Sequence, residues 1–166
     1  MPLDPGILGT GLGALEPVDT EAEGIDNFMT AWEDYFSLAS VSGVPTVPGS
    51  LNGALSTMRG AMTGVGNQDA AANIIQAAII AFWGVVAGAA ASIWVPPNPV
   101  VSATVPPGLG NIGTTIQGIF DSNTAGKLEL AVCAVNVANA LHPLQLGGIA
   151  ITQPPPPSGP VPVPIL

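Results

Sequence analysis

The side chains that most often carry chemistry are few in this sequence. His142 is the only histidine and Cys133 is the only cysteine. One histidine cannot build a histidine-rich metal site, and residues this far apart in the chain indicate no Ser-His-Asp or Cys-His arrangement. Glu33 and Asp34 are neighbours, but adjacent residues point about 100° apart on a helix and make a poor acid/base pair. We therefore predict a protein that is not an enzyme and that uses no metal and no cofactor.

Both unusual residues have simple structural interpretations. His142 falls at the predicted C-terminal end of a helix, where the helix dipole and free carbonyl groups favour it. Cys133 is interpreted as a small apolar residue on a helix face, and a single cysteine excludes an internal disulfide.

The charge balance excludes further classes of function. Charged residues make up 8% of the 166 residues, and the net charge is −9. Arg59 and Lys127 are the only basic residues, too few to neutralise a nucleic-acid backbone or to dock on an anionic membrane surface. We expect so uncharged a surface to be covered by neighbouring subunits or by lipid.

The stretch from Ala70 to Val95 holds the longest apolar run, and it allows two interpretations. About 20 apolar residues suffice to cross a bilayer, but a central helix buried from several sides has the same composition. The flanks lack positive charge, Trp83 falls in the middle of the run, and alanines replace leucines, all of which favours the buried helix. Gly84 and Gly88 form a small-xxx-small pattern, which predicts a close contact with another helix.

Helical spacing of apolar residues predicts the other helices of one domain. The first expected helix is capped by Thr20 and ends near Gly43, and the second is capped by Ser50 and ends near Met62. Two further helices are expected, from Ile112 to Phe120 and from Thr124 to His142. Asn67 is expected to cap the central helix. The proline-rich stretch after Trp94 is expected to be extended or an edge strand, and a short strand is expected between Leu144 and Thr152.

Both ends of the chain are predicted to be extended arms. Residues 1–19 are rich in glycine and proline, and residues 20–152 are expected to form the helical domain. Residues 153–166 are rich in proline, with four consecutive prolines and then alternating valine and proline. Apolar side chains on such arms favour docking on a neighbour. The predicted subunit-interface residues are Ile7, Leu8, Leu12, Gly84, Gly88, Val161, Val163, Ile165 and Leu166.

These observations predict an all-α fold, a bundle of about five helices around a long apolar central helix, with extended proline-rich arms. Three stretches then carry a resemblance: the run from PTVPGSLNGALSTMRGAM through AANIIQAAIIAFWG, VPPGLGNIGTTIQGIFDSN, and PPPPSGPVPVP. Together they resemble small virion structural proteins of tailed bacteriophages, found in tail, neck or baseplate assemblies. The resemblance covers residues 45–164 and implies incorporation into a virus particle.

The expected function is therefore that of a non-enzymatic structural subunit, whose partners are other copies of itself and other virion proteins. Two alternatives stay open. In one, residues 74–95 cross a membrane, as in a small holin-like protein. In the other, Pro154 to Pro157 present a polyproline segment to an aromatic groove of another protein.

Overall fold

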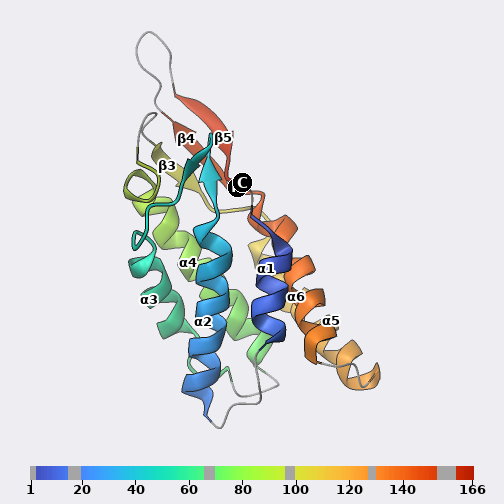
Figure 1. Ribbon diagram of the computed structural model, residues 1–166. Helices are drawn as coiled ribbons and strands as arrows, with labels where there is room; N and C mark the ends of the chain where they lie inside the picture. The colour runs from blue at the N-terminus through green and yellow to red at the C-terminus, as the bar shows by residue number, and fades with distance from the viewer. Residues whose placement is uncertain (1–2, 15–19, 66–69, 96–99, 127–129, 153–159) are drawn as a thin grey trace.

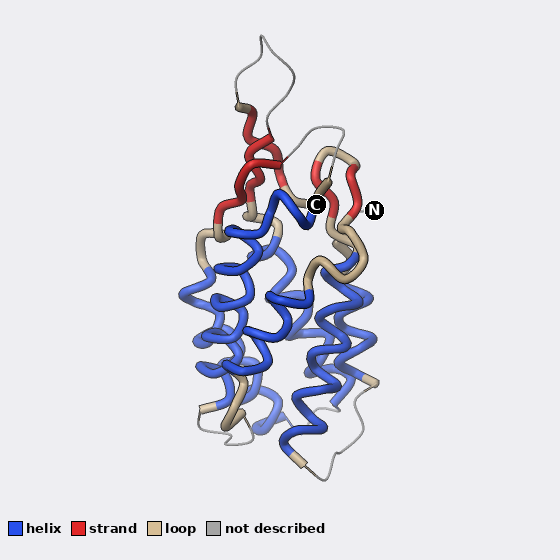
Figure 2. The backbone as a smooth tube through the Cα atoms, turned by 90° about the vertical axis from the view of Figure 1, so that its left-hand side faces the viewer, coloured by secondary structure: helices blue, strands red, loops and turns tan. Residues whose placement is uncertain are grey.

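The chain folds into a helical body that carries its strands at one end (Figure 1). The computed structural model describes residues 3–14, 20–65, 70–95, 100–126, 130–152 and 160–166. These residues form six α-helices and a few short antiparallel strands, so the protein is mostly helical. Figure 2 shows the helices running side by side and the strands gathered beyond one end of them.

Helix α1 (Pro5–Gly13) lies where an extended arm was predicted, so that prediction is wrong for these residues. Asp4 caps the helix by accepting a hydrogen bond from the Gly6 amide at 2.8 Å, and Pro5 occupies the first turn, where its missing N–H is not needed. The helix packs against α2 and α6. A Cβ atom at Gly11 would lie 2.7 Å from the Ala31 Cβ, so this glycine permits a close helix contact.

Helices α2 (Glu21–Ser37) and α3 (Asn52–Ala61) follow the predicted pattern. The Thr20 side chain caps α2 by accepting a hydrogen bond from the Glu23 amide at 3.2 Å, as expected. Ser50 does not cap α3, because its hydroxyl donates instead to the Val47 carbonyl at 2.6 Å.

Helix α4 (Ala71–Ile93) is the long apolar helix, and it packs against α3, α5 and strand β3. Trp83, at its middle, is completely buried. Among the described residues α4 is also the one helix long and apolar enough to cross a membrane, and 39% of its most apolar window is buried in this fold. The predicted capping residue Asn67 lies outside the described residues.

Helices α5 (Ile112–Gly126) and α6 (Leu130–Gln145) both run past their predicted ends. The turn predicted at residues 121–123 is wrong, because α5 continues through it. The predicted end at His142 and Pro143 is wrong as well, since α6 contains Pro143 and ends at Gln145. A short 3-10 turn, η1 (Leu109–Asn111), leads into α5.

The strands form two small antiparallel sheets. Strands β1 (Ser40–Val41) and β2 (Val44–Pro45) make a hairpin, while β3 (Val100–Thr104), β4 (Ile149–Thr152) and β5 (Val161–Pro164) form a sheet in the order β3-β4-β5. Strands β3 and β4 confirm the extended segments expected after Trp94 and before residue 153. Beyond β5 the chain also reaches the hairpin, because Leu166 exchanges two backbone hydrogen bonds with Ser40 at 2.7 and 3.0 Å.

An aromatic cluster joins the helices to the larger sheet. Phe82 and Trp83 on α4 meet Phe36 of α2 edge to face, with ring centroids 4.8 and 5.3 Å away. The Trp83 indole N–H donates to the side-chain carbonyl of Gln145, which is fully buried. A Cβ at Gly148 would lie 2.7 Å from the far end of the Trp83 ring, so only glycine fits where α6 leads into β4.

We predict that Trp83→Phe lowers the free energy of unfolding by about 1 to 3 kcal/mol beyond the loss of packing, because it leaves the Gln145 carbonyl buried without a donor. Urea unfolding followed by circular dichroism measures this. The double variant Trp83→Phe/Gln145→Leu should recover part of the loss, since both polar partners are then removed. No recovery in the double variant would contradict the role given to this hydrogen bond.

A second prediction concerns the last residues of the chain. Ile165 is fully buried, whereas the Leu166 side chain is 45% exposed. Ile165→Ala should cost about 2 to 5 kcal/mol of stability through the cavity that it leaves. Leu166→Ala keeps the backbone pairing with Ser40 and should change stability by only about 0.5 kcal/mol. Equal effects of the two variants in thermal unfolding would contradict the burial of this segment.

Candidate subunit interface

The predicted interface residues of the N-terminal segment divide between core and surface. Leu8 and Leu12 are buried in the contacts of α1 with its own chain, and Ile7 on the same helix is exposed. Leu8 and Leu12 thus hold α1 in place and do not face a neighbour in this fold. A surface role for Ile7 stays a prediction.

Gly84 and Gly88 lie on the exposed side of α4. A Cβ added at either glycine would meet nothing within 4 Å, so neither makes a close contact within its own chain. The close contact through glycines lies elsewhere, on α1, where a Cβ at Gly9 would lie 3.5 Å from Val135 of α6 and one at Gly13 would lie 3.5 Å from Ala131. Sequence reasoning missed this pair, although it has the same spacing of four residues.

The four C-terminal residues also divide. Ile165 is buried, Val163 is half-buried, and Val161 and Leu166 are exposed. Strand β5, which contains Val161 and Val163, pairs with β4 of the same chain, so this segment forms part of the body of the protein. Docking of Val161 or Leu166 on a neighbour stays a prediction, and Pro154 to Pro157 lie outside the described residues.

Three long stretches of the chain, which include the strands, contain no charged side chain. Residues 38–50, 93–120 and 143–166 contain no aspartate, glutamate, lysine or arginine. Several large apolar side chains are nevertheless exposed there: Val95, Val101, Val105, Leu146, Ile149, Val161 and Leu166. Such a surface has few charged groups to interact with water and is suited to contact with another protein surface.

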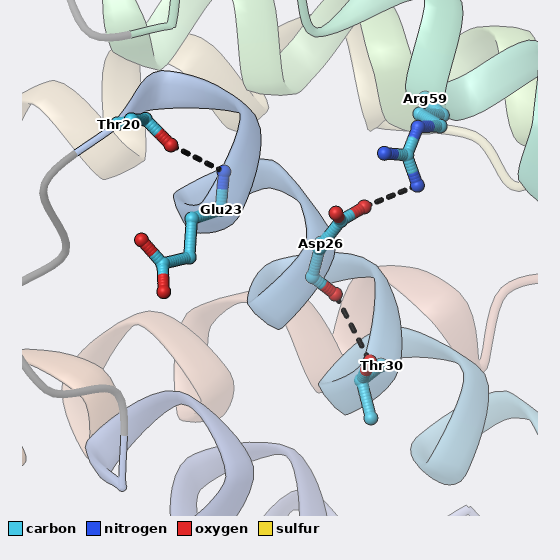
Figure 3. A network of polar contacts seen from close by, with 5 residues as sticks. All are labelled: Thr20, Glu23, Asp26, Thr30 and Arg59. Carbon is cyan, nitrogen blue, oxygen red and sulfur yellow. Dashed lines mark hydrogen bonds and ion pairs between the residues drawn. The ribbon is translucent and has the colours of Figure 1, made fainter.

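Charged side chains gather instead around the start of α2, at the end of the body farther from the strands (Figure 1). Figure 3 shows the network there: Thr20 caps α2, Asp26 forms an ion pair with Arg59 of α3, and Thr30 donates to the Asp26 carbonyl at 3.0 Å. Both partners of the ion pair are about half exposed, so it contributes roughly 0 to 1 kcal/mol. The network ties α2 to α3.

A groove of about 410 Å³ lies beside this network, between α2 and α3. Asp26, Glu33, Asn52, Ser56 and Arg59 are among its lining residues. It combines carboxylates, an amide, a hydroxyl and a cation, and neither a histidine nor a cysteine is among its lining residues.

Tyr35 and His142 form the most buried polar contact between ionisable groups among the described residues. The Tyr35 hydroxyl lies 3.0 Å from Nδ1 of His142. Burial, with a smaller contribution from the Asp4 carboxylate, raises the pKa of Tyr35 well above its usual value. The phenol thus keeps its proton at neutral pH, and the tautomer of His142 decides which of the two groups donates in this hydrogen bond. This pair links α2 to α6, and His142 lies in the last turn of α6, near the helix end at which it was expected.

Cys133, Glu33 and Asp34 are the remaining residues that the sequence analysis considered for chemistry. Cys133 is buried on α6, as predicted, and burial raises the pKa of its thiol, which makes it a poor nucleophile. Glu33 and Asp34 are both exposed on α2. Over the described ranges, no three histidine, cysteine, aspartate or glutamate side chains are placed to hold a metal ion.

Comparisons with known proteins identify no relative from which a function could be inferred, so the surface of the molecule is the main functional evidence. No protein-family model matches the chain, and neither the curated proteins nor the solved structures include a significant match.

The His142 contact predicts a pH dependence of stability. Burial lowers the pKa of His142 below its usual value of 6.5, an effect that the Asp4 carboxylate partly offsets. The unfolded chain therefore binds more protons, and stability falls as the pH drops below 6.5 through the folded pKa.

This dependence can be assigned because His142 is the only histidine. The unfolding free energy of the natural chain should decrease between pH 7 and pH 5, near the usual histidine pKa, and His142→Gln should remove most of that decrease. Parallel pH profiles for the two proteins would contradict the assignment.

Proposed function

We propose that this protein is a non-enzymatic structural subunit of a large homo- or hetero-oligomeric particle, most consistent with a bacteriophage virion of which it forms part of the tail, neck or baseplate. The observation that carries the proposal is the low charge around the strands, whose own residues and flanking stretches carry no charge, while exposed valines, leucines and an isoleucine surround them. Contact with neighbouring subunits removes this apolar surface from water. The resemblance to virion proteins supplies the kind of particle.

The contacts in this proposal come from the surface of a rigid body. Helix α1 and strand β5 pack on their own chain, so these parts of the two predicted arms add to the body. The shortage of charge also favours a permanent assembly, since obligate interfaces are more apolar than transient ones.

Co-sedimentation tests the proposal. A tagged chain expressed during infection should sediment with virus particles on a density gradient, with mass spectrometry as the readout. It should stay bound in about 1 M sodium chloride, because contacts without charged groups are not screened by salt. Recovery of the chain in the unassembled fraction alone, or its release by salt, would contradict the proposal.

A single-span membrane protein is the second candidate, and helix α4 is the observation that favours it. In that case residues 74–95 meet lipid, with Gly84 and Gly88 at a helix contact. Alkaline carbonate extraction separates the candidates: a chain retained in the membrane pellet supports the span, whereas a released chain that sediments with particles supports the virion subunit.

A further inference from the structure

The two edges of the larger sheet differ in their capacity to bind another strand. In an antiparallel pair, the N–H and C=O groups of one residue point to the same side of the strand, and the side alternates along the chain. The Ile165 amide donates to the Gly148 carbonyl at 3.0 Å, so Ile165 faces β4. By alternation Val161 and Val163 also face β4, while Pro162 and Pro164 face outward.

The outward edge of β5 is closed. Pro162 and Pro164 have no N–H to donate, and the next outward residue, Leu166, is already paired with Ser40 of β1. Another strand cannot form a regular ladder along this edge. Proline on an edge strand is a known protection against unwanted pairing.

The outward edge of β3 is open along the part of the chain that the structure describes. Ala150 faces β5, so Ile149 and Ile151 face β3, where they pair with Thr104 and Ser102. Ala103, between these two, therefore directs its N–H and C=O away from the sheet. Val105 follows on the same edge, whereas the register shift between Val100 and Ser102 makes Val101 an extra residue in the ladder. Val101 and Val105 are 55% and 42% exposed.

We infer that the β3 edge binds the β3 edge of a second copy, in an antiparallel two-fold pair centred on Ala103. The two Ala103 residues then exchange N–H···O=C hydrogen bonds, and the valines of one strand meet those of the other. The pairing is self-complementary, as a two-fold interface requires. Because the β5 edge is closed, the combined sheet stops at two copies and does not extend into a fibre.

The distribution of charge favours a second copy as the occupant. The chain carries a net charge of −9, so two copies repel each other wherever carboxylates meet. Residues 93–120, which include β3, contain no charged residue, and the acidic start of α2 lies toward the other end of the body (Figure 1). This edge therefore lets two identical acidic chains meet without opposing carboxylates. The inference deepens the proposed function and rests on it, since it names the first partner within the assembly.

Analytical ultracentrifugation of the full chain over a concentration series tests the pair. We expect a monomer–dimer equilibrium with no larger species. Val101→Lys places a charged side chain opposite the apolar Val105 of the second copy, where it loses water without gaining a partner. It should raise the dimer Kd about tenfold or more, which corresponds to about 1.4 kcal/mol. The matched control is Val161→Lys, an exposed valine on the closed edge, and it should leave the Kd unchanged.

A second variant addresses the backbone directly. Ala103→Pro removes the outward N–H without removing a hydrogen bond to β4, and it should weaken the dimer as well. In the natural chain, hydrogen exchange at the Ala103 amide should slow as concentration rises, and Val101→Lys should abolish that slowing while thermal unfolding shows that it remains folded. This readout stands even if Ala103→Pro does not fold.

The possible outcomes distinguish the β3 pairing from the proposed function as a particle subunit. A chain that is monomeric at every concentration, larger oligomers, or equal weakening by Val101→Lys and Val161→Lys would overturn the β3 pairing. If such a chain still co-sediments with particles, the proposed function stands without this pairing. If the dimer forms as described but the chain is absent from particles, the pairing is supported and the proposed function fails.

Discussion

The indole ring of Trp83 is the point at which the helices and the strands of this protein meet. Its faces and edges contact aromatic rings of α2 and α4, and its N–H is bound by Gln145 at the end of α6. Gly148, at the start of the sheet, comes so close to the ring that no side chain fits. The path of the chain from α6 into β4 therefore depends on one buried side chain of α4.

A low supply of charge shapes the rest of the molecule. With 8% charged residues, the helices cannot be held together by many ion pairs, and the ion pair of Asp26 with Arg59 is half exposed. Packing of apolar and small side chains holds the helices together instead, as in the contact of Gly11 with Ala31. The same shortage leaves the strands and the stretches beside them without charged residues, which connects the internal packing of the fold to the interface proposed for its surface.

The sequence could predict those parts of the fold that depend on local pattern. Helices α2 and α4 follow from the spacing of their apolar residues and, for α2, from the Thr20 cap. Helix α1 could not be predicted in this way, because its glycines resemble helix breakers until α6 and α2 are placed against them. Strand β5 pairs with the preceding strand β4 of its own chain, whereas its valines and prolines alone predicted an arm on a neighbour. Pro143 is accommodated inside α6 although proline usually ends a helix. For the candidate interface, the uncharged stretches are visible in the sequence, but the direction of the Ala103 amide depends on the strand register.

The pairing of Leu166 with Ser40 also constrains the order in which the protein can fold. The hairpin of β1 and β2 gains its outer partner only after nearly the whole described chain has been synthesised and its ends have been brought together. Closing the long loop between Ser40 and Leu166 is entropically unfavourable, and contacts between residues so far apart in sequence slow folding in general. Until that step, Val41 lacks its pairing with Ile165, and Ile165 itself is not yet buried. A chain of this fold is therefore expected to be more prone to aggregation during synthesis than after its last residues have packed.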